Sequence, residues 1–224
     1  MPTALITGAS GGLGSAIARA LAPTHSLLLA GRPSPRLDAL AEALGAPTFP
    51  LDLTDIDSIE ASTEVIDQLD VLVHNAGVAP FAGVADSDIG DWRTTFEVNV
   101  IGAVALTQAV LPALRGAEGH VIFINSGAGL NVLPGAASYS ASKFALRAVA
   151  DSLRAEEPAL RVTSVHPGRI DTAMQRELVA FEGGEYDESS LLKPETVAGL
   201  IADVVATPPD AQVHEIIVRQ RPKR

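Results

Sequence analysis

The fold of this chain is decided by Thr7-Gly8-Ala9-Ser10-Gly11-Gly12-Leu13-Gly14, which joins a short apolar run at residues 3–7 to a helix-forming segment at residues 12–22. Glycines at a strand-to-helix turn let the backbone pass close to a pyrophosphate, and the helix N-terminus presents free N–H groups and a positive dipole end to it. The spacing is neither G-x-G-x-x-G nor that of a P-loop, because no Gly-Lys-Ser or Gly-Lys-Thr follows. The stretch predicts a nucleotide-binding turn, and an ordinary glycine turn is the alternative.

The rest of the chain alternates short β-type runs with longer helix-type segments, which is the pattern of a parallel sheet covered by helices. We predict strands at residues 3–7, 26–30, 48–51, 71–74, 120–125, 162–166 and 215–219. We predict helices at residues 12–22, 35–44, 55–67, 87–115, 138–156 and 195–206. Together they predict one α/β domain over residues 1–224, a doubly wound, Rossmann-like parallel sheet of about seven strands with helices on both faces, in three layers.

Residues 173–193 break this rhythm, because clusters of Gly, Glu, Asp and Ser interrupt any apolar period. We interpret the segment as a substrate lid loop, with a solvated surface excursion as the alternative. Its apolar residues, such as Met174 and Phe181, together with Leu130 and Leu133, predict a mainly apolar substrate pocket.

Composition excludes several classes of function. The chain has 16 Lys and Arg against 27 Asp and Glu, a net charge of −11, so without a basic stripe we expect no nucleic-acid partner. The absence of Cys excludes a disulfide scaffold, a thiolate nucleophile and a Cys-ligated metal site. Neither a secretory signal nor a run of eighteen apolar residues is visible, so we expect a cytoplasmic protein with no membrane partner.

The sharpest chemical pattern is Ser126, followed by Tyr139 and Lys143. Tyr139 and Lys143 are four residues apart in a predicted helix, so they share one face. A phenol is a poor base at neutral pH, but an adjacent ammonium favours the phenolate and lowers the pKa of the phenol. Ser126 follows a predicted strand, where its hydroxyl can bond a carbonyl oxygen while the tyrosine supplies the proton. Oxygen activation therefore needs no metal, and we expect none.

These residues and the Thr-Gly-x-x-x-Gly-x-Gly form of the first turn resemble the short-chain dehydrogenase/reductase family. The family's catalytic Ser, Tyr and Lys occur with this spacing, and the resemblance adds Asn99, in Phe96-Glu97-Val98-Asn99-Val100, as a residue that holds a proton-relaying water. An exposed polar position or a bond to its own backbone is the alternative for Asn99.

The resemblance also implies a set of cofactor contacts at the carboxyl ends of the strands. Asp52 and Leu53 would meet the adenine, and Asn75, Ala76 and Gly77 would border its ribose. The alternatives are a residue beside a helix N-cap for Asp52 and an ordinary turn for 75–77. His74, where the family more often has Asn, is interpreted as structural. The full predicted set is Gly8, Ser10, Gly11, Gly12, Leu13, Gly14, Arg32, Asp52, Leu53, Asn75, Ala76, Gly77, Tyr139, Lys143, Pro167, Gly168, Ile170 and Thr172.

The end of the second strand indicates which dinucleotide fits. NAD-binding folds usually carry an acid there for the ribose hydroxyls, whereas an Arg accommodates a 2′-phosphate. Here the strand ends in Arg32, and the nearest following acid is Asp38, inside the next helix. We therefore expect NADP(H) in preference to NAD. The departure from some NADP-preferring relatives is Ser10-Gly11, where they carry a second basic residue in the first turn.

We accordingly expect an oxidoreductase that moves a hydride between NADP(H) and a small carbonyl or secondary alcohol, with Tyr139 as general acid and base. One alternative is a catalytically idle, dinucleotide-sensing protein of the same fold, and another is a dehydratase or epimerase, which normally needs a larger C-terminal region. Surplus apolar residues in the helices at 87–115 and 138–156, such as Leu106, Phe144 and Leu146, predict a homodimer or homotetramer.

Overall fold

The computed structural model describes residues 1–221, so residues 222–224 of the expected domain lie outside the described part. The strands are β1 Thr3–Thr7, β2 Ser26–Gly31, β3 Thr48–Pro50, β4 Val71–His74, β5 His120–Ile124, β6 Arg161–Pro167 and β7 Glu215–Val218. The α-helices are α1 Gly12–Leu21, α2 Pro35–Leu44, α3 Ile56–Thr63, α4 Ile89–Phe96, α5 Gly102–Ala117, α6 Ala137–Glu156, α7 Ala173–Phe181 and α8 Pro194–Val205. Short helical turns are η1 Glu97–Ile101, η2 Gly127–Gly129 and η3 Glu188–Ser190.

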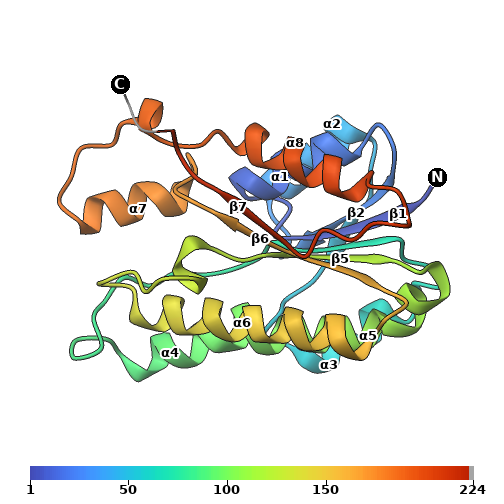
Figure 1. Cartoon of the computed structure of the whole chain (residues 1–224), viewed down its shortest axis with the longest axis horizontal. Helices are drawn as coiled ribbons and strands as arrows, with labels where there is room; N and C mark the ends of the chain where they lie inside the picture. Colours follow the sequence, from blue (N-terminus) through green and yellow to red (C-terminus); the bar gives the residue numbers. More distant parts are fainter. Residues whose placement is uncertain (222–224) are drawn as a thin grey trace.

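The seven strands form one parallel sheet in the order β3-β2-β1-β4-β5-β6-β7. Figure 1 shows α1, α2 and α8 on one face and α3, α4, α5 and α6 on the other, which makes three layers. This confirms the predicted doubly wound fold. The order reverses between β1 and β4, and in such sheets a crevice forms outside the carboxyl ends of the strands at this point.

Alternation along each strand supplies the two hydrophobic cores. In β1, Ile6 points to the core under α1 and α8, whereas Leu5 points to the core under α3, α5 and α6. In β5, Ile122 and Phe123 divide between the same two cores. Since successive strand residues face opposite sides, a run that is buried on both faces reads as continuously apolar.

The predicted helix at 87–115 is divided in the structure. The π-helical turn η1 separates α4 from α5, and it places Asn99 in the interior at 1% exposure. The helix packs closely on the backbone of Leu53 at Gly102, where a Cβ would lie 2.3 Å from the Leu53 carbonyl oxygen. The helical run Ile89–Ala117 is long and apolar enough to cross a membrane by length and composition, but its buried residues, such as Leu106 and Val110, belong to the core on the sheet.

The segment at 173–193 contains a helix that the sequence analysis missed. The Thr172 side chain caps α7 by accepting from the Gln175 N–H at 3.3 Å, and Gly183 follows the helix in the left-handed conformation at a φ of 67°. Only Gln175 and Leu178 of α7 are buried. The helix was missed because the Gly, Glu, Asp and Ser clusters that follow it, at residues 182–190, led to a loop interpretation of the whole segment.

Candidate active site

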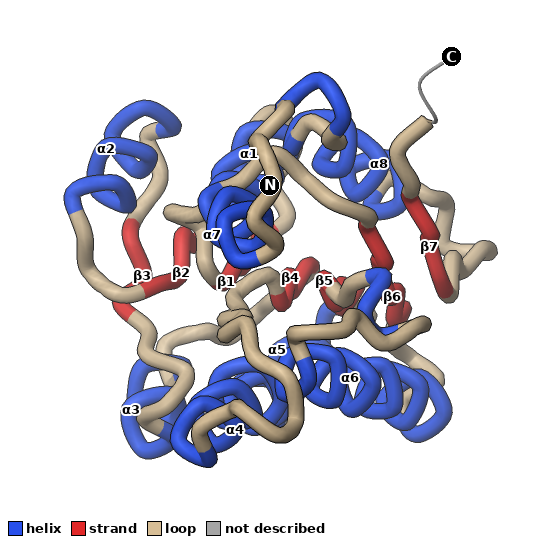
Figure 2. Tube along the Cα trace, turned by 90° about the vertical axis from the view of Figure 1, so that its left-hand side faces the viewer, coloured by secondary structure: helices blue, strands red, loops and turns tan. Residues whose placement is uncertain are grey.

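A cleft of about 1240 Å³ opens at the carboxyl ends of the strands. Every predicted catalytic and cofactor residue lines it except Asn99. Figure 2 views this end of the molecule and shows α7 over the strand ends, between the two helical layers. The fold thus gathers segments from residue 7 to residue 219 around one cavity.

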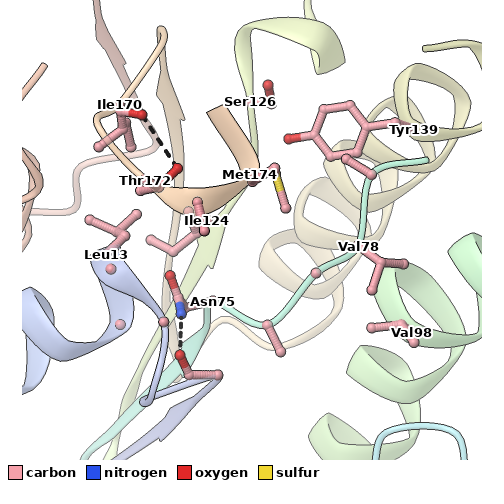
Figure 3. A pocket seen from close by; sticks show the side chains of 18 of the residues that line it. Leu13, Asn75, Val78, Val98, Ile124, Ser126, Tyr139, Ile170, Thr172 and Met174 are labelled. Atoms are coloured by element: carbon pink, nitrogen blue, oxygen red, sulfur yellow. Dashed lines mark hydrogen bonds between the residues drawn. The ribbon is translucent and has the colours of Figure 1, made fainter. Parts of the chain in front are cut away.

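The glycine-rich turn is held against the end of β4. The Asn75 side-chain amide donates to the carbonyl oxygens of Thr7 at 3.0 Å and Gly8 at 3.1 Å, and Asn75 is labelled in Figure 3. Gly8 has a φ of 63°, and a Cβ on Gly14 would lie 2.2 Å from the Gly8 carbonyl oxygen. The turn therefore requires glycine at both positions.

The first turn of α1 is suited to an anion. Its N-cap residue, Gly11, has no side chain that could bond the free N–H groups of that turn. The N-terminus of a helix attracts phosphate through these N–H groups and the helix dipole. The glycine-rich turn and the helix N-terminus fit the pyrophosphate of a dinucleotide, and the volume of the cleft fits the whole molecule.

Two arginines and one acid line the part of the cleft next to the glycine-rich turn, at the ends of β2 and β3. Arg32 and Arg36 are exposed. The Asp52 carboxylate accepts from the N–H of Thr54 at 2.9 Å and from its hydroxyl at 2.8 Å. These bonds lower the pKa of Asp52, and the charge of Arg32 contributes in the same direction. Within residues 1–221, neither arginine forms an ion pair with a carboxylate.

Ser126, Tyr139 and Lys143 meet in the middle of the cleft. Ser126 follows β5, and its hydroxyl lies close enough to the phenol of Tyr139 to affect its pKa. Burial raises the pKa of Tyr139, and the nearby Ser126 hydroxyl acts in the opposite direction. Figure 3 shows both side chains at the same opening, with Met174 of α7 beside them.

Lys143 is 4% exposed, and its ammonium donates to the Ile124 carbonyl oxygen at 2.9 Å. The Nζ atom is 5.7 Å from the centre of the Tyr139 ring. Burial lowers the pKa of Lys143 to about 8, which still leaves the amine mostly protonated at pH 7. The positive charge that the sequence analysis assigns to this position is therefore compatible with its burial.

Asn99 lies behind this group instead of in the cleft wall. Its Oδ1 accepts from the Val78 N–H at 2.8 Å, and its Nδ2 donates to the Val78 carbonyl oxygen at 2.9 Å and to Ser142 Oγ at 3.0 Å. A Cβ on Gly77 would lie 3.2 Å from Asn99 Oδ1 and 3.7 Å from Lys143 Nζ, so the three residues are close together. Asn99 fixes the backbone that follows β4.

The turn after β6 faces the first turn of α1. A Cβ on Gly12 would lie 3.2 Å from Thr172 Cγ2, and the Thr172 hydroxyl donates to the Ile170 carbonyl oxygen at 3.3 Å, as Figure 3 shows. His166 bonds the Ser126 carbonyl oxygen through Nδ1 at 3.1 Å. The turn at 166–172 is thus tied both to Ser126 and to α1.

His74 has the structural place expected of it. Its Nε2 bonds the Thr107 hydroxyl at 2.8 Å, and its ring stacks on Phe123 with centroids 4.8 Å apart. Burial lowers the pKa of His74 to about 3, with a smaller contribution from Lys143, so the ring is neutral at pH 7. Within residues 1–221, no cluster of three or more His, Asp or Glu side chains could hold a metal ion.

Sequence reasoning missed most of the side chains that shape the substrate end. Arg169 forms a double hydrogen bond with Glu182, and the Tyr186 hydroxyl donates to Asp171, which also pairs with Arg176 at 2.9 Å. Burial and the Asp171 carboxylate raise the pKa of Tyr186 to about 12. These contacts join the segment after α7 to the turn after β6.

Further lining residues that the sequence analysis left out are Arg36, Phe81, Asn131, Gln175 and Arg219. Phe181 of α7 stacks on Phe81 at 5.9 Å, so α7 also reaches the loop after β4. Gln175 is 6% exposed, and its Nε2 has no hydrogen-bond partner among residues 1–221. No local motif marks these residues, because each enters the cleft through packing between distant segments.

Comparisons with known proteins agree on one family of dehydrogenases and oxidoreductases. The family model described as short chain dehydrogenase matches residues 2–183. The chain is 31% identical to an uncharacterised oxidoreductase of Staphylococcus epidermidis, over 96% of both chains. It is 36% identical to the glycine betaine reductase of Emericella nidulans, where the match covers 97% of this chain and 18% of that protein. Among solved structures, an alcohol dehydrogenase from the archaeon Thermococcus sibiricus, complexed with 5-hydroxy-NADP, matches with a TM-score of 0.88, 31% identity and full coverage of both chains.

Proposed function

Since the chain belongs to the short chain dehydrogenase family, we propose that it is an NADP(H)-dependent reductase of small carbonyl compounds, or the dehydrogenase of the matching alcohols. One observation carries the proposal. The Tyr139 phenol lies near Ser126 and one helical turn from the buried Lys143, in the cleft whose other end is the glycine-rich turn.

The bound nicotinamide supplies or accepts the hydride, and the residues of this chain hold the substrate and move its proton. Ser126 donates a hydrogen bond to the carbonyl oxygen. In reduction Tyr139 gives its proton to that oxygen, and in oxidation its phenolate removes the proton from the alcohol.

The pKa of Tyr139 needs two opposing influences for this task. Burial raises the pKa and keeps the phenol protonated, which suits donation during reduction. Protonated Lys143 favours the phenolate, which suits oxidation. Lys143 is interpreted as acting through its charge, because its ammonium bonds the backbone at Ile124 and thereby keeps a fixed position beside α6.

Arg32 supports NADP(H) over NAD(H). It is exposed at the end of β2 without an ion-pair partner in residues 1–221, so its guanidinium is free to bind a 2′-phosphate. Arg36, in the first turn of α2, adds a second positive charge at this end. The solved alcohol dehydrogenase from Thermococcus sibiricus contains an NADP derivative, which agrees with this choice.

We also propose that the chain forms a homodimer or homotetramer through the face of α5 and α6. Phe144 in α6 is 42% exposed, and Ile101, which directly precedes α5, is 40% exposed. Leu106 and Leu146, which contributed to the sequence-based expectation, are instead buried in the chain's own core. Light scattering at micromolar concentration tests the proposal, and a monomer mass would contradict it.

The proposed activity is tested with a panel of small secondary alcohols with NADP⁺ and of the matching carbonyls with NADPH, while NADPH binding is followed by its fluorescence. We expect binding and turnover of at least one pair. Binding of NADPH without turnover of any pair would contradict the proposal and favour a dinucleotide-sensing protein.

A further inference from the structure

Arg219 follows β7 directly and reaches back to the catalytic serine. Its guanidinium lies against Gly127, the residue after Ser126, because a Cβ on Gly127 would be 3.3 Å from Arg219 Nη2 and 3.6 Å from Nη1. Arg219 also lines the cleft that contains Ser126 and Tyr139. A positive charge therefore lies against the residue that follows Ser126, in the same cleft.

The hydrogen bonds of Arg219 fix its position without neutralising it. Its Nη1 donates to the carbonyl oxygens of His166 at 2.7 Å and Val218 at 3.1 Å. No carboxylate of residues 1–221 forms an ion pair with it. Nη2 has no hydrogen-bond partner within the same residues, so it can donate to a ligand.

Arg169 provides the contrast within the same cleft. Its guanidinium is paired with the Glu182 carboxylate through two hydrogen bonds, so its charge is already balanced. In a chain with 27 acidic residues and 16 basic ones, an arginine without an acidic partner at the reaction centre is informative. Guanidinium groups bind carboxylates with strong, directional, charge-assisted hydrogen bonds.

We propose that Arg219 binds a carboxylate group of the substrate, so that the favoured substrates are short oxo acids and the corresponding hydroxy acids. This inference rests on the proposed reductase activity. Ser126 would bond the reacting oxygen and Arg219 the carboxylate. Arg219 contacts the residue next to Ser126, and consecutive Cα atoms are about 3.8 Å apart, so we expect short substrates in which few carbons separate the two groups.

The test compares acids with their neutral esters. Pyruvate, acetoacetate and levulinate place the ketone at positions 2, 3 and 4, and each is paired with its methyl ester in NADPH-dependent reduction. We expect kcat/KM for at least one acid to exceed that for its ester by about tenfold or more, the usual scale of a charge-assisted hydrogen bond. Arg219→Gln should remove this preference through a higher KM for the acid, with the ester's kcat/KM retained.

Two matched variants separate charge from position. Arg219→Lys keeps the charge and should retain part of the preference, whereas a loss as large as that in Arg219→Gln would contradict the proposal. Arg169→Gln combined with Glu182→Gln removes an arginine of the same cleft together with the carboxylate that balances it, and we expect this variant to leave the ratio of acid to ester unchanged. A changed ratio there equal to that in Arg219→Gln would overturn the assignment to Arg219.

The remaining outcomes are also decisive. Equal or better turnover of all esters by the wild type would overturn the carboxylate inference and leave the reductase proposal intact. Equal loss of acid and ester turnover in Arg219→Gln would show that Arg219 only supports the Ser126 turn. Failure of the wild type with acids, esters and the wider alcohol and carbonyl panel alike would instead reject the proposed function itself.

Discussion

The two ends of the cleft are built in different ways. The end at the glycine-rich turn depends on close backbone packing, as between Gly8 and Gly14 and in the bonds from Asn75 to the turn. The end around Tyr139 depends on side chains from distant segments, such as Phe81 with Phe181 and Arg169 with Glu182. Backbone packing demands particular residues at fixed spacing, whereas contacts between side chains allow substitution. The first end is therefore suited to a nucleotide that many proteins share, and the second is suited to adaptation toward a particular substrate.

The largest effect that we expect at the reaction end is that of Lys143→Met. Removing the charge should lower kcat by about 10²- to 10⁴-fold, the scale of a positioned general acid or base. The pKa of Tyr139 should rise, because burial then acts without the opposing ammonium, so residual alcohol oxidation should shift to higher pH. Initial rates from pH 6 to 10 measure this shift. An unchanged profile would show that Lys143 does not act through its charge.

At the glycine end, two helical glycines should respond in opposite directions to alanine. Gly14→Ala places a Cβ 2.2 Å from the Gly8 carbonyl oxygen and should destabilise the fold by about 1–3 kcal/mol or more, with loss of NADPH binding. Gly199→Ala in α8 meets no atom of the described residues within 4 Å and should stabilise the fold by about 0.5–1 kcal/mol. Urea unfolding measures both. Similar changes in the free energy of unfolding of the two variants would contradict the view that the glycine end depends on close packing.

A side chain also contributes to the cofactor end, and Arg32→Ala tests it. NADPH binding should weaken by about 1.5–3 kcal/mol, because a charge-assisted bond to the 2′-phosphate is lost, while NADH binding stays nearly constant. Arg36→Ala is the neighbouring control and should have a smaller effect. Titration of both cofactors provides the measurement, and equal losses for NADPH and NADH in Arg32→Ala would mean that the arginine only supports the fold.

The smallest effect is expected for Phe181→Ala, which loosens α7 at the substrate end. The ring pair with Phe81 contributes on the order of 0.5–1.5 kcal/mol, so the substrate KM should rise by several fold. NADPH affinity should remain constant, because the change lies far from the glycine end. Steady-state kinetics with cofactor titration separate the two effects, and a loss of NADPH affinity equal to the rise in KM would contradict the independence of the two ends.

The same contrast explains what the sequence could reveal. Strands such as β1 and β4 were predicted with their observed bounds, because residues buried on both faces form short apolar runs. The residues of the glycine turn and the Tyr139–Lys143 pair follow local spacing, so they could be located before the structure was known. The π-helical turn at Asn99 could not, because it depends on contacts with a distant segment, the bonds of Asn99 to Val78. Arg219 was missed for the same reason. The helix α7 has a local signal in its Thr172 cap, but the polar clusters after it masked that signal.

The central claim is that Tyr139 transfers the proton that accompanies hydride transfer, and Tyr139→Phe tests it most directly. The substitution removes one hydroxyl and keeps the ring, so NADPH affinity and the urea midpoint should match those of the wild type. For any accepted alcohol and carbonyl pair, kcat should fall by about 10²- to 10⁴-fold in both directions. Turnover close to that of the wild type, with NADPH bound equally well, would contradict the account.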